Sequence, residues 1–143
     1  PLLAIFKQLG TGYKKIRIFT KIKQDKIDFT HICMEYKDSI ATCKIGVGVK
    51  SEGSLIISGT KGYIYVPAPW WKTDYFELRY EDQNKNQKYF YKWDGAGLRY
   101  EIQEFISCIL NKRFSTSRLR RRESVCMAEV MEQFTNRKNF MEI

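Results

Sequence analysis

The sequence predicts an α+β fold, a mostly antiparallel sheet of about seven strands with helices packed on one face. Two observations predict it. Alternating apolar and polar residues recur between residues 14 and 93, interrupted by short polar or glycine-containing turns, and two helical patterns follow within residues 97–135. At 143 residues, the chain is long enough to bury a core, and its length predicts a single domain, residues 1–143.

Residues 53–67 predict a β-hairpin at the centre of this sheet. Both runs are apolar and rich in β-branched and aromatic residues, with Ile57 in the first and Ile64 in the second. Gly59 and Gly62 supply the backbone freedom that a tight connection needs. Pro67 ends the second strand, because proline cannot donate to a ladder.

The remaining strands are predicted on either side of this hairpin, over residues 14–23, 26–36, 39–49, 74–81 and 87–93. Lys37 and Asp38 form a turn short enough for an antiparallel pair. Gly46 and Gly48 leave one face of their strand shallow, which permits close approach of another group. We favour packing over ligand binding at these two glycines.

Helical spacing predicts the end of a linking helix over residues 1–9 and two closing helices within residues 97–135. The first closing helix has an apolar stripe of Leu98, Ile102, Phe105, Ile106 and Ile109. The second has a stripe of Val125, Ala128, Met131 and Phe134. The carboxylates of these helices, Glu101, Glu104, Glu123 and Glu129, occupy positions typical of solvent-facing charges.

The formal net charge of +9, together with 21 aromatic residues, raises the possibility of a nucleic-acid surface. Basic residues cluster near the start, from Lys14 to Lys26, and near the end, from Arg118 to Arg122. No RNP, KH or zinc-finger motif accompanies them. A solvated basic face is the favoured interpretation, and we expect no specific nucleic-acid partner.

The sequence offers no catalytic or metal constellation. Cys33, Cys43, Cys108 and Cys126 are scattered without a C-x-x-C pair, and His31 is the only histidine, so we expect reduced thiols and no metal site. No Ser/His/Asp arrangement has plausible spacing. No apolar run approaches the length of a membrane span, which predicts a cytoplasmic protein without a membrane partner.

Two blocks of sequence carry a family resemblance. The first is Gly59-Thr-Lys-Gly62-Tyr-Ile, followed by Val66-Pro67 and Trp70-Trp71. The second is Gly95-Ala-Gly-Leu-Arg-Tyr-Glu-Ile-Gln-Glu-Phe105, followed by Ser117, Glu123-Ser-Val-Cys-Met127 and Met131. In this order they resemble the C-terminal domain of Gfo/Idh/MocA oxidoreductases, which are NAD(P)-dependent sugar and diol dehydrogenases with a GAPDH-like C-terminal fold.

The resemblance implies that the chain is the C-terminal substrate and oligomerisation domain of a parent dehydrogenase that uses NAD or NADP. The family's N-terminal Rossmann domain, its E-K-P lysine and its D-x-G-x-[HY] segment have no counterpart here, so a fragment that is inactive and binds no cofactor by itself is expected. The implied substrate is a sugar, a sugar derivative or a polyol. The alternatives are a non-catalytic oligomerisation or binding module and, less favoured, a basic nucleic-acid-binding domain.

Arg99 and Tyr100 are the predicted substrate-binding residues of this domain. Helical spacing places Arg99 at the edge of the apolar stripe and Tyr100 nearly opposite it. Both lie in the first turn after Gly95-Ala-Gly97, where backbone N–H groups favour an anionic or hydroxyl-rich ligand. The alternative is that Arg99 pairs with a nearby carboxylate while Tyr100 packs on another domain or subunit. A homo-oligomer is also expected, through a sheet face that carries Tyr63 and Tyr65 and Tyr89, Tyr91 and Trp93.

Overall fold

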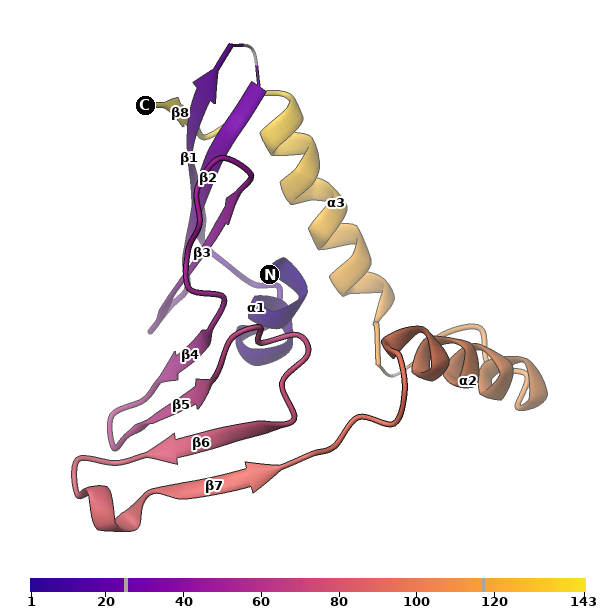
Figure 1. Cartoon of the computed structure of the whole chain (residues 1–143). Helices are drawn as coiled ribbons and strands as arrows, with labels where there is room; N and C mark the ends of the chain where they lie inside the picture. The colour runs from indigo at the N-terminus through magenta and orange to yellow at the C-terminus, as the bar shows by residue number, and fades with distance from the viewer. Residues whose placement is uncertain (25, 117) are drawn as a thin grey trace. The chain divides into compact units, whose positions relative to one another are not determined.

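The computed structural model describes residues 1–24, 26–116 and 118–143, and it confirms the α+β class (Figure 1). Ser117, one of the residues that carry the family resemblance, lies outside the described ranges. The elements are α1 (Leu2–Leu9), β1 (Lys15–Lys23), β2 (Lys26–Glu35), β3 (Ile40–Gly46), β4 (Leu55–Ser58), β5 (Tyr63–Val66), β6 (Tyr75–Arg79), a 3-10 helix η1 (Gln83–Lys85), β7 (Gln87–Phe90), α2 (Gly97–Leu110), α3 (Arg121–Thr135) and β8 (Phe140–Glu142).

The chain forms two compact units, each with its own four-stranded sheet. Unit 1 comprises residues 1–50 and 107–143, and unit 2 comprises residues 51–106. The strands that the sequence predicts in a single sheet are thus divided between two sheets. The division falls after β3, where the N–H groups of Val47 and Gly48 both turn to donate to the carbonyl of Asp28 instead of continuing the ladder.

Sheet A, in unit 1, has the strand order β3-β2-β1-β8. The first three strands pair antiparallel, as the short turn at Lys37 and Asp38 predicts. The fourth, β8, was not predicted from the sequence. It lies parallel to β1, with Phe140 opposite Ile18, and a three-residue strand gives too short a pattern to recognise.

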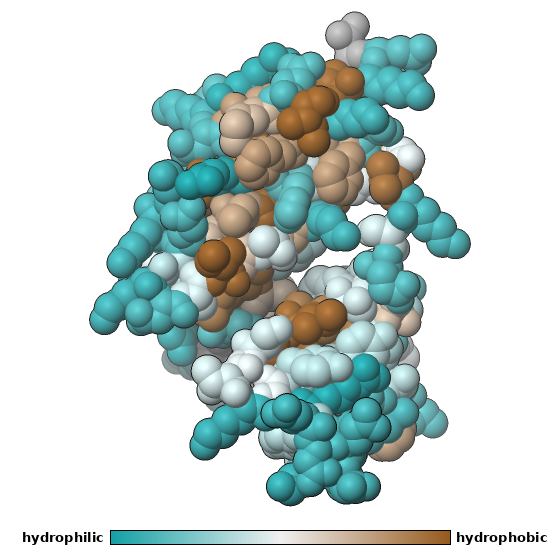
Figure 2. All heavy atoms as spheres, turned by 90° about the vertical axis from the view of Figure 1, so that its left-hand side faces the viewer, coloured by the Kyte–Doolittle hydropathy of each residue, from teal (hydrophilic) through white to brown (hydrophobic). Residues whose placement is uncertain are grey.

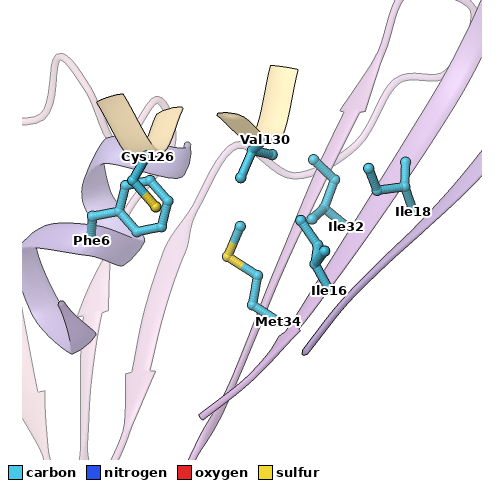
Figure 3. Packing of buried hydrophobic residues seen from close by; sticks show 7 residues of the cluster. All are labelled: Phe6, Ile16, Ile18, Ile32, Met34, Cys126 and Val130. Atoms are coloured by element: carbon cyan, nitrogen blue, oxygen red, sulfur yellow. The ribbon is translucent and has the colours of Figure 1, made fainter. Parts of the chain in front are cut away.

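Helices α1 and α3 pack on the same face of sheet A and build the core of unit 1 (Figure 3). Strand alternation brings four side chains to this face, and the helices add three. The buried cluster consists of Ile16, Ile18, Ile32 and Met34 from the sheet, Phe6 from α1, and Cys126 and Val130 from α3. At the end of the same face, the buried hydroxyls of Thr20 and Thr30 lie 3.3 Å apart and satisfy one another.

The buried side of α3 differs from the predicted stripe. Cys126 and Val130 are buried, whereas Val125 is exposed and Met131 is 64% exposed. The prediction was wrong for Val125, Ala128 and Met131, although Phe134 does pack against the core. Apolar residues occupy two neighbouring sides of this helix, so periodicity alone could not tell which side meets the sheet.

Sheet B, in unit 2, has the order β4-β5-β6-β7, with every pair antiparallel. The central hairpin predicted from residues 53–67 is confirmed as β4 and β5, closed by a 2.9 Å hydrogen bond from the N–H of Gly59 to the carbonyl of Gly62. Gly62 has a clear steric role, because a Cβ there would lie 2.5 Å from the carbonyl oxygen of Arg79.

The aromatic residues of sheet B divide between its two faces. Tyr65 lies opposite Glu77, and Glu77 lies opposite Lys88, so these three side chains share one face. Tyr89 follows Lys88 and lies on the other face, where its ring stacks on Phe76 at 5.1 Å. Tyr63 and Tyr65 therefore cannot form one surface of this sheet together with Tyr89.

Helix α2 forms where the sequence predicts it, and its apolar stripe is exposed. The five stripe residues are between 49% and 67% exposed, and no residue of α2 is buried. Of the described helices, α1 and α3 pack on a sheet, whereas α2 buries none of its residues. None of the helices in the described ranges combines the length and the hydropathy that a bilayer crossing requires.

Candidate functional site

The predicted residues Arg99 and Tyr100 meet Trp93 and Asp94 at the start of α2, and we call these four residues the Trp93–Tyr100 corner. Gly95, with φ of 74°, turns the chain between the two pairs. The Nη1 atom of Arg99 lies 2.6 Å from Oδ2 of Asp94. The backbone N–H of Asp94 donates to the hydroxyl of Tyr100 at 2.8 Å.

Aromatic contacts fix the other side of the corner. The ring of Trp93 meets the ring of Tyr100 edge to face, with centroids 5.3 Å apart. The indole N–H of Trp93 donates to the carbonyl of Thr73 at 2.9 Å. Trp93 is therefore anchored at both ends, and about half of its surface, 51%, remains exposed.

The side chains of the corner are largely exposed, with Trp93 51% exposed and the side chain of Arg99 62% exposed. The ion pair of Arg99 with Asp94 is exposed, so it holds the guanidinium in place with little effect on stability. The guanidinium of Arg99 has five N–H donors, Asp94 engages one of its nitrogens, and the exposed indole of Trp93 belongs to the same corner. Donors beside an aromatic surface suit a ligand with hydroxyl groups and a hydrocarbon face.

The sequence predicted Arg99 and Tyr100 as substrate-binding residues, which stays a prediction, and it did not single out their neighbours Trp93 and Asp94. Trp93 was expected inside a strand, whereas β7 ends at Phe90. The available signal was the dipeptide Asp94-Gly95, which is typical of a turn. The expected carboxylate partner of Arg99 is Asp94, and Tyr100 packs on Trp93 of its own chain.

A second polar cluster joins α1 to α3 in unit 1. The Nζ atom of Lys7 and the backbone N–H of Arg120 both bind Oε2 of Glu123, at 2.7 and 2.8 Å. Only 8% of Glu123 is exposed, so the prediction that it is a solvent-facing helix charge was wrong. Both donors favour the ionised form, and the ammonium of Lys7 is the main reason that the pKa of Glu123 lies below its usual range.

A cavity of about 490 Å³ opens beside this cluster, lined by Phe6, Lys7, Gly10, Thr11, Gly12, Arg120, Arg122 and Glu123. The side chain of Glu123 accepts a hydrogen bond from the backbone N–H of Arg120, as in a capping box. The reciprocal bond cannot form, because an arginine side chain has no acceptor for the backbone N–H of Glu123. Lys7 is already paired with Glu123. The cluster is thus a structural tie between two helices.

Within the part of the chain that the structure describes, the cysteines and the histidine do not cluster into a metal centre. Cys126 is buried and Cys33, Cys43 and Cys108 are half-buried, all as free thiols. Burial raises the pKa of the Cys43 and Cys126 thiols, which disfavours the reactive thiolate. His31 contacts the rings of Phe19 and Phe29. Across the described ranges, no group of three or more His, Cys, Asp or Glu residues could hold a metal ion.

The fold formed by these elements is similar to that of the C-terminal domains of oxidoreductases, which confirms the expected fold. KijD10, a 3-ketoreductase from Actinomadura kijaniata, matches over 100% of this chain in two variants bound to TDP-benzene and NADP, with TM-scores of 0.70 and 0.69 at 11% identity. YPO2259 of Yersinia pestis, assigned as an oxidoreductase, matches over 96% with a TM-score of 0.66 at 13% identity.

These likenesses concern the fold, because the sequence identities are low. The chain spans about half the length of the structures it matches, 46% for KijD10 and 45% for YPO2259. The sequence itself matches no protein-family model and no curated protein.

Proposed function

We propose that this chain is the substrate and assembly domain of an NAD(P)-dependent oxidoreductase that acts on a sugar, a sugar derivative or a polyol. One observation carries the proposal: the whole chain superimposes on about half of a ketoreductase whose structure holds NADP and a TDP derivative. A Rossmann domain that binds NAD or NADP would supply the other half of the parent protein. A cytoplasmic location is part of the proposal.

Within the parent protein, the Trp93–Tyr100 corner would contact the substrate. The exposed indole of Trp93 provides an apolar surface for the carbon face of a sugar ring, and Arg99 provides donors for its hydroxyl groups. Hydride transfer would belong to the cofactor. The corner would therefore orient the substrate and would not take part in the chemical step.

Expression of the complete reading frame tests the proposal. The complete protein should carry a G-x-G-x-x-G loop between a strand and a helix, and it should reduce NAD or NADP in the presence of a sugar or polyol. A panel of pentoses, hexoses, inositols and nucleotide-linked sugars would define the substrate class. A complete protein without a nucleotide-binding fold would instead favour the non-catalytic binding module.

We further propose that the domain self-associates through the face of sheet B that carries Tyr63 and Tyr65. The guanidinium of Arg79 lies 4.2 Å from the ring centroid of Tyr65, and both Arg79 and Lys88 pair with Glu77. Since Glu77 offsets these charges, a second copy could pack on the tyrosines with limited repulsion.

Light scattering tests this self-association. The wild-type chain should have a mass at least twice the 17.0 kDa of a single copy. Tyr65→Glu should shift it to the monomer, because a second copy would bury the new carboxylate. Lys61→Glu, in the exposed turn of the hairpin, is the matched control and should leave the mass unchanged. A monomeric wild-type chain at high concentration would contradict the proposal.

A further inference from the structure

The positive charge of this protein is concentrated in unit 1. Unit 1 has 18 Lys and Arg residues against 8 Asp and Glu, whereas unit 2 has 7 against 8. The net positive charge of the whole chain therefore comes entirely from unit 1, which contains sheet A. Such an asymmetry is typical of a surface that meets an anionic partner.

Sheet A has a face that neither α1 nor α3 covers, because both helices pack on its other side. We call it the open face, and it is seen in Figure 2, where apolar side chains lie among hydrophilic ones in the upper half of the view. The residues of the open face that matter here are Phe19, Lys21, Phe29, His31, Lys44 and Lys15.

Three rings and three lysines alternate on the open face. Phe19 lies opposite His31, which in turn lies opposite Lys44 on β3, and Lys21 lies opposite Phe29. The ring centroids of Phe19 and Phe29 are each 6.5 Å from that of His31. The rings are half-buried, whereas Lys15, Lys21 and Lys44 are exposed.

Glu35, the cross-strand partner of Lys15 on the open face, is engaged by an arginine. Glu35 lies 3.1 Å from a guanidinium nitrogen of Arg17, its neighbour on the same face. Lys15, Lys21 and Lys44 themselves form no ion pair with a described residue, and Glu35 is the cross-strand neighbour of Lys15. Two copies of the chain placed face to face would bring these like charges together, which opposes self-association here.

We propose that the open face of sheet A binds single-stranded nucleic acid without sequence preference. Phosphates would contact Lys15, Lys21 and Lys44, and bases would stack on Phe19, Phe29 and His31. A duplex would offer only its phosphates, because its bases are already stacked on one another. This site is independent of the proposed substrate and assembly surfaces, which lie in unit 2.

Fluorescence anisotropy with a labelled oligothymidylate of about 12 nucleotides tests the proposal, with a hairpin duplex of similar charge as comparison. We expect the single strand to bind more tightly than the duplex. The logarithm of the binding constant should fall with the logarithm of salt concentration at a slope of about −2, the value for three phosphate contacts on a single strand.

Two pairs of variants separate stacking from charge. Phe19→Ala and Phe29→Ala should each weaken binding between about fivefold and a hundredfold, the range for losing one base–aromatic stack, whereas Phe90→Ala on sheet B should not. Lys21→Gln with Lys44→Gln should reduce the steepness of the salt dependence by about 1.4. The same exchange at Lys61 and Lys72 of unit 2 should leave the slope unchanged.

Three outcomes would overturn the proposal. The first is a duplex that binds as tightly as the single strand. The second is binding that survives the lysine exchanges on sheet A but is lost in the triple variant Arg120→Gln, Arg121→Gln and Arg122→Gln, because the site would then be the basic residues at the start of α3. The third is light scattering that shows a dimer disrupted by Phe19→Glu. The lysine variants lie on the surface, so they keep the test valid if a phenylalanine variant fails to fold.

Discussion

An ion pair between Lys7 and Glu123 joins two residues that are 116 positions apart in the sequence. Lys7 lies in the last turn of α1 and Glu123 in the first turn of α3. The charges suit these positions, since a cation is favourable at a helix C-terminus and an anion at a helix N-terminus. The pair therefore ties together the two helices that cover sheet A.

This pair predicts a loss of stability in acid. Because the pKa of Glu123 is lowered in the folded state, its contribution is present above the unfolded pKa of about 4.3 and is lost as the pH falls through the folded value. Glu123→Gln should be less stable than wild type at pH 7 and should lose less stability between pH 5 and pH 3. Urea unfolding at these pH values measures the difference.

The exposed Glu132, on the same helix, provides the control for this prediction. Glu132→Gln should unfold with the same pH dependence as the wild-type chain. Parallel curves for Glu123→Gln and wild type would show that the carboxylate of Glu123 does not contribute to acid unfolding.

The two methionines Met34 and Met131 should differ sharply in their contribution to stability. Met34 is fully buried in the core of unit 1, whereas Met131 is largely exposed. Met34→Ala should lower the free energy of unfolding by about 2–5 kcal/mol, because it leaves a cavity. Met131→Ala should change it by less than about 0.5 kcal/mol. Equal losses in the free energy of unfolding for the two variants, measured by chemical denaturation, would support the predicted stripe in which Met131 is buried.

Gly62→Ala should destabilise sheet B by about 1–3 kcal/mol, the usual cost of overpacking. The new Cβ would approach the backbone oxygen of Arg79, which cannot move without shifting β6. Gly97→Ala is the matched control, because open space surrounds Gly97 at the start of α2 and alanine favours the helix. Thermal unfolding should rank Gly97→Ala at or above wild type, and the opposite order would refute the steric role of Gly62.

Arg99→Ala and Tyr100→Phe should alter kinetics in the complete oxidoreductase without altering its assembly. Loss of the guanidinium of Arg99 should raise the KM for the substrate, since a donor to the substrate hydroxyls disappears. Melting temperature and oligomer size should stay nearly unchanged, because the Arg99–Asp94 pair is exposed. Unaltered kinetics together with a lost oligomer would assign the corner to packing instead.

The chain by itself should not bind NAD(P)H with useful affinity. Pyrophosphate binding uses a glycine-rich turn between a strand and a helix, within a βαβ unit. The parallel pair in sheet A joins β1 to β8, and no glycine lies between α3 and β8. A titration of cofactor fluorescence should show no saturable change, and low-micromolar binding would contradict the prediction.

The sequence by itself determined the elements whose causes are local. The hairpin closed by Gly59 and Gly62, the turn at Lys37 and Asp38, and the helical spacing of α2 each depend on residues within a few positions of one another. Turn chemistry and side-chain periodicity act over such distances, so their signals are present in the chain. The placement of Arg99 and Tyr100 in the first turn of a helix was predicted for the same reason, whereas their role in substrate binding stays a prediction.

Only the tertiary structure decided how distant segments meet. The side of α3 that is buried was decided by Phe6 and the strands facing Cys126 and Val130, and the burial of Glu123 followed from Lys7. The division into two sheets, the parallel addition of β8 and the separation of Tyr65 from Tyr89 all depend on strand partners and register. Those choices are fixed by contacts between residues far apart in the chain, and a one-residue change of register exchanges the two faces of a strand.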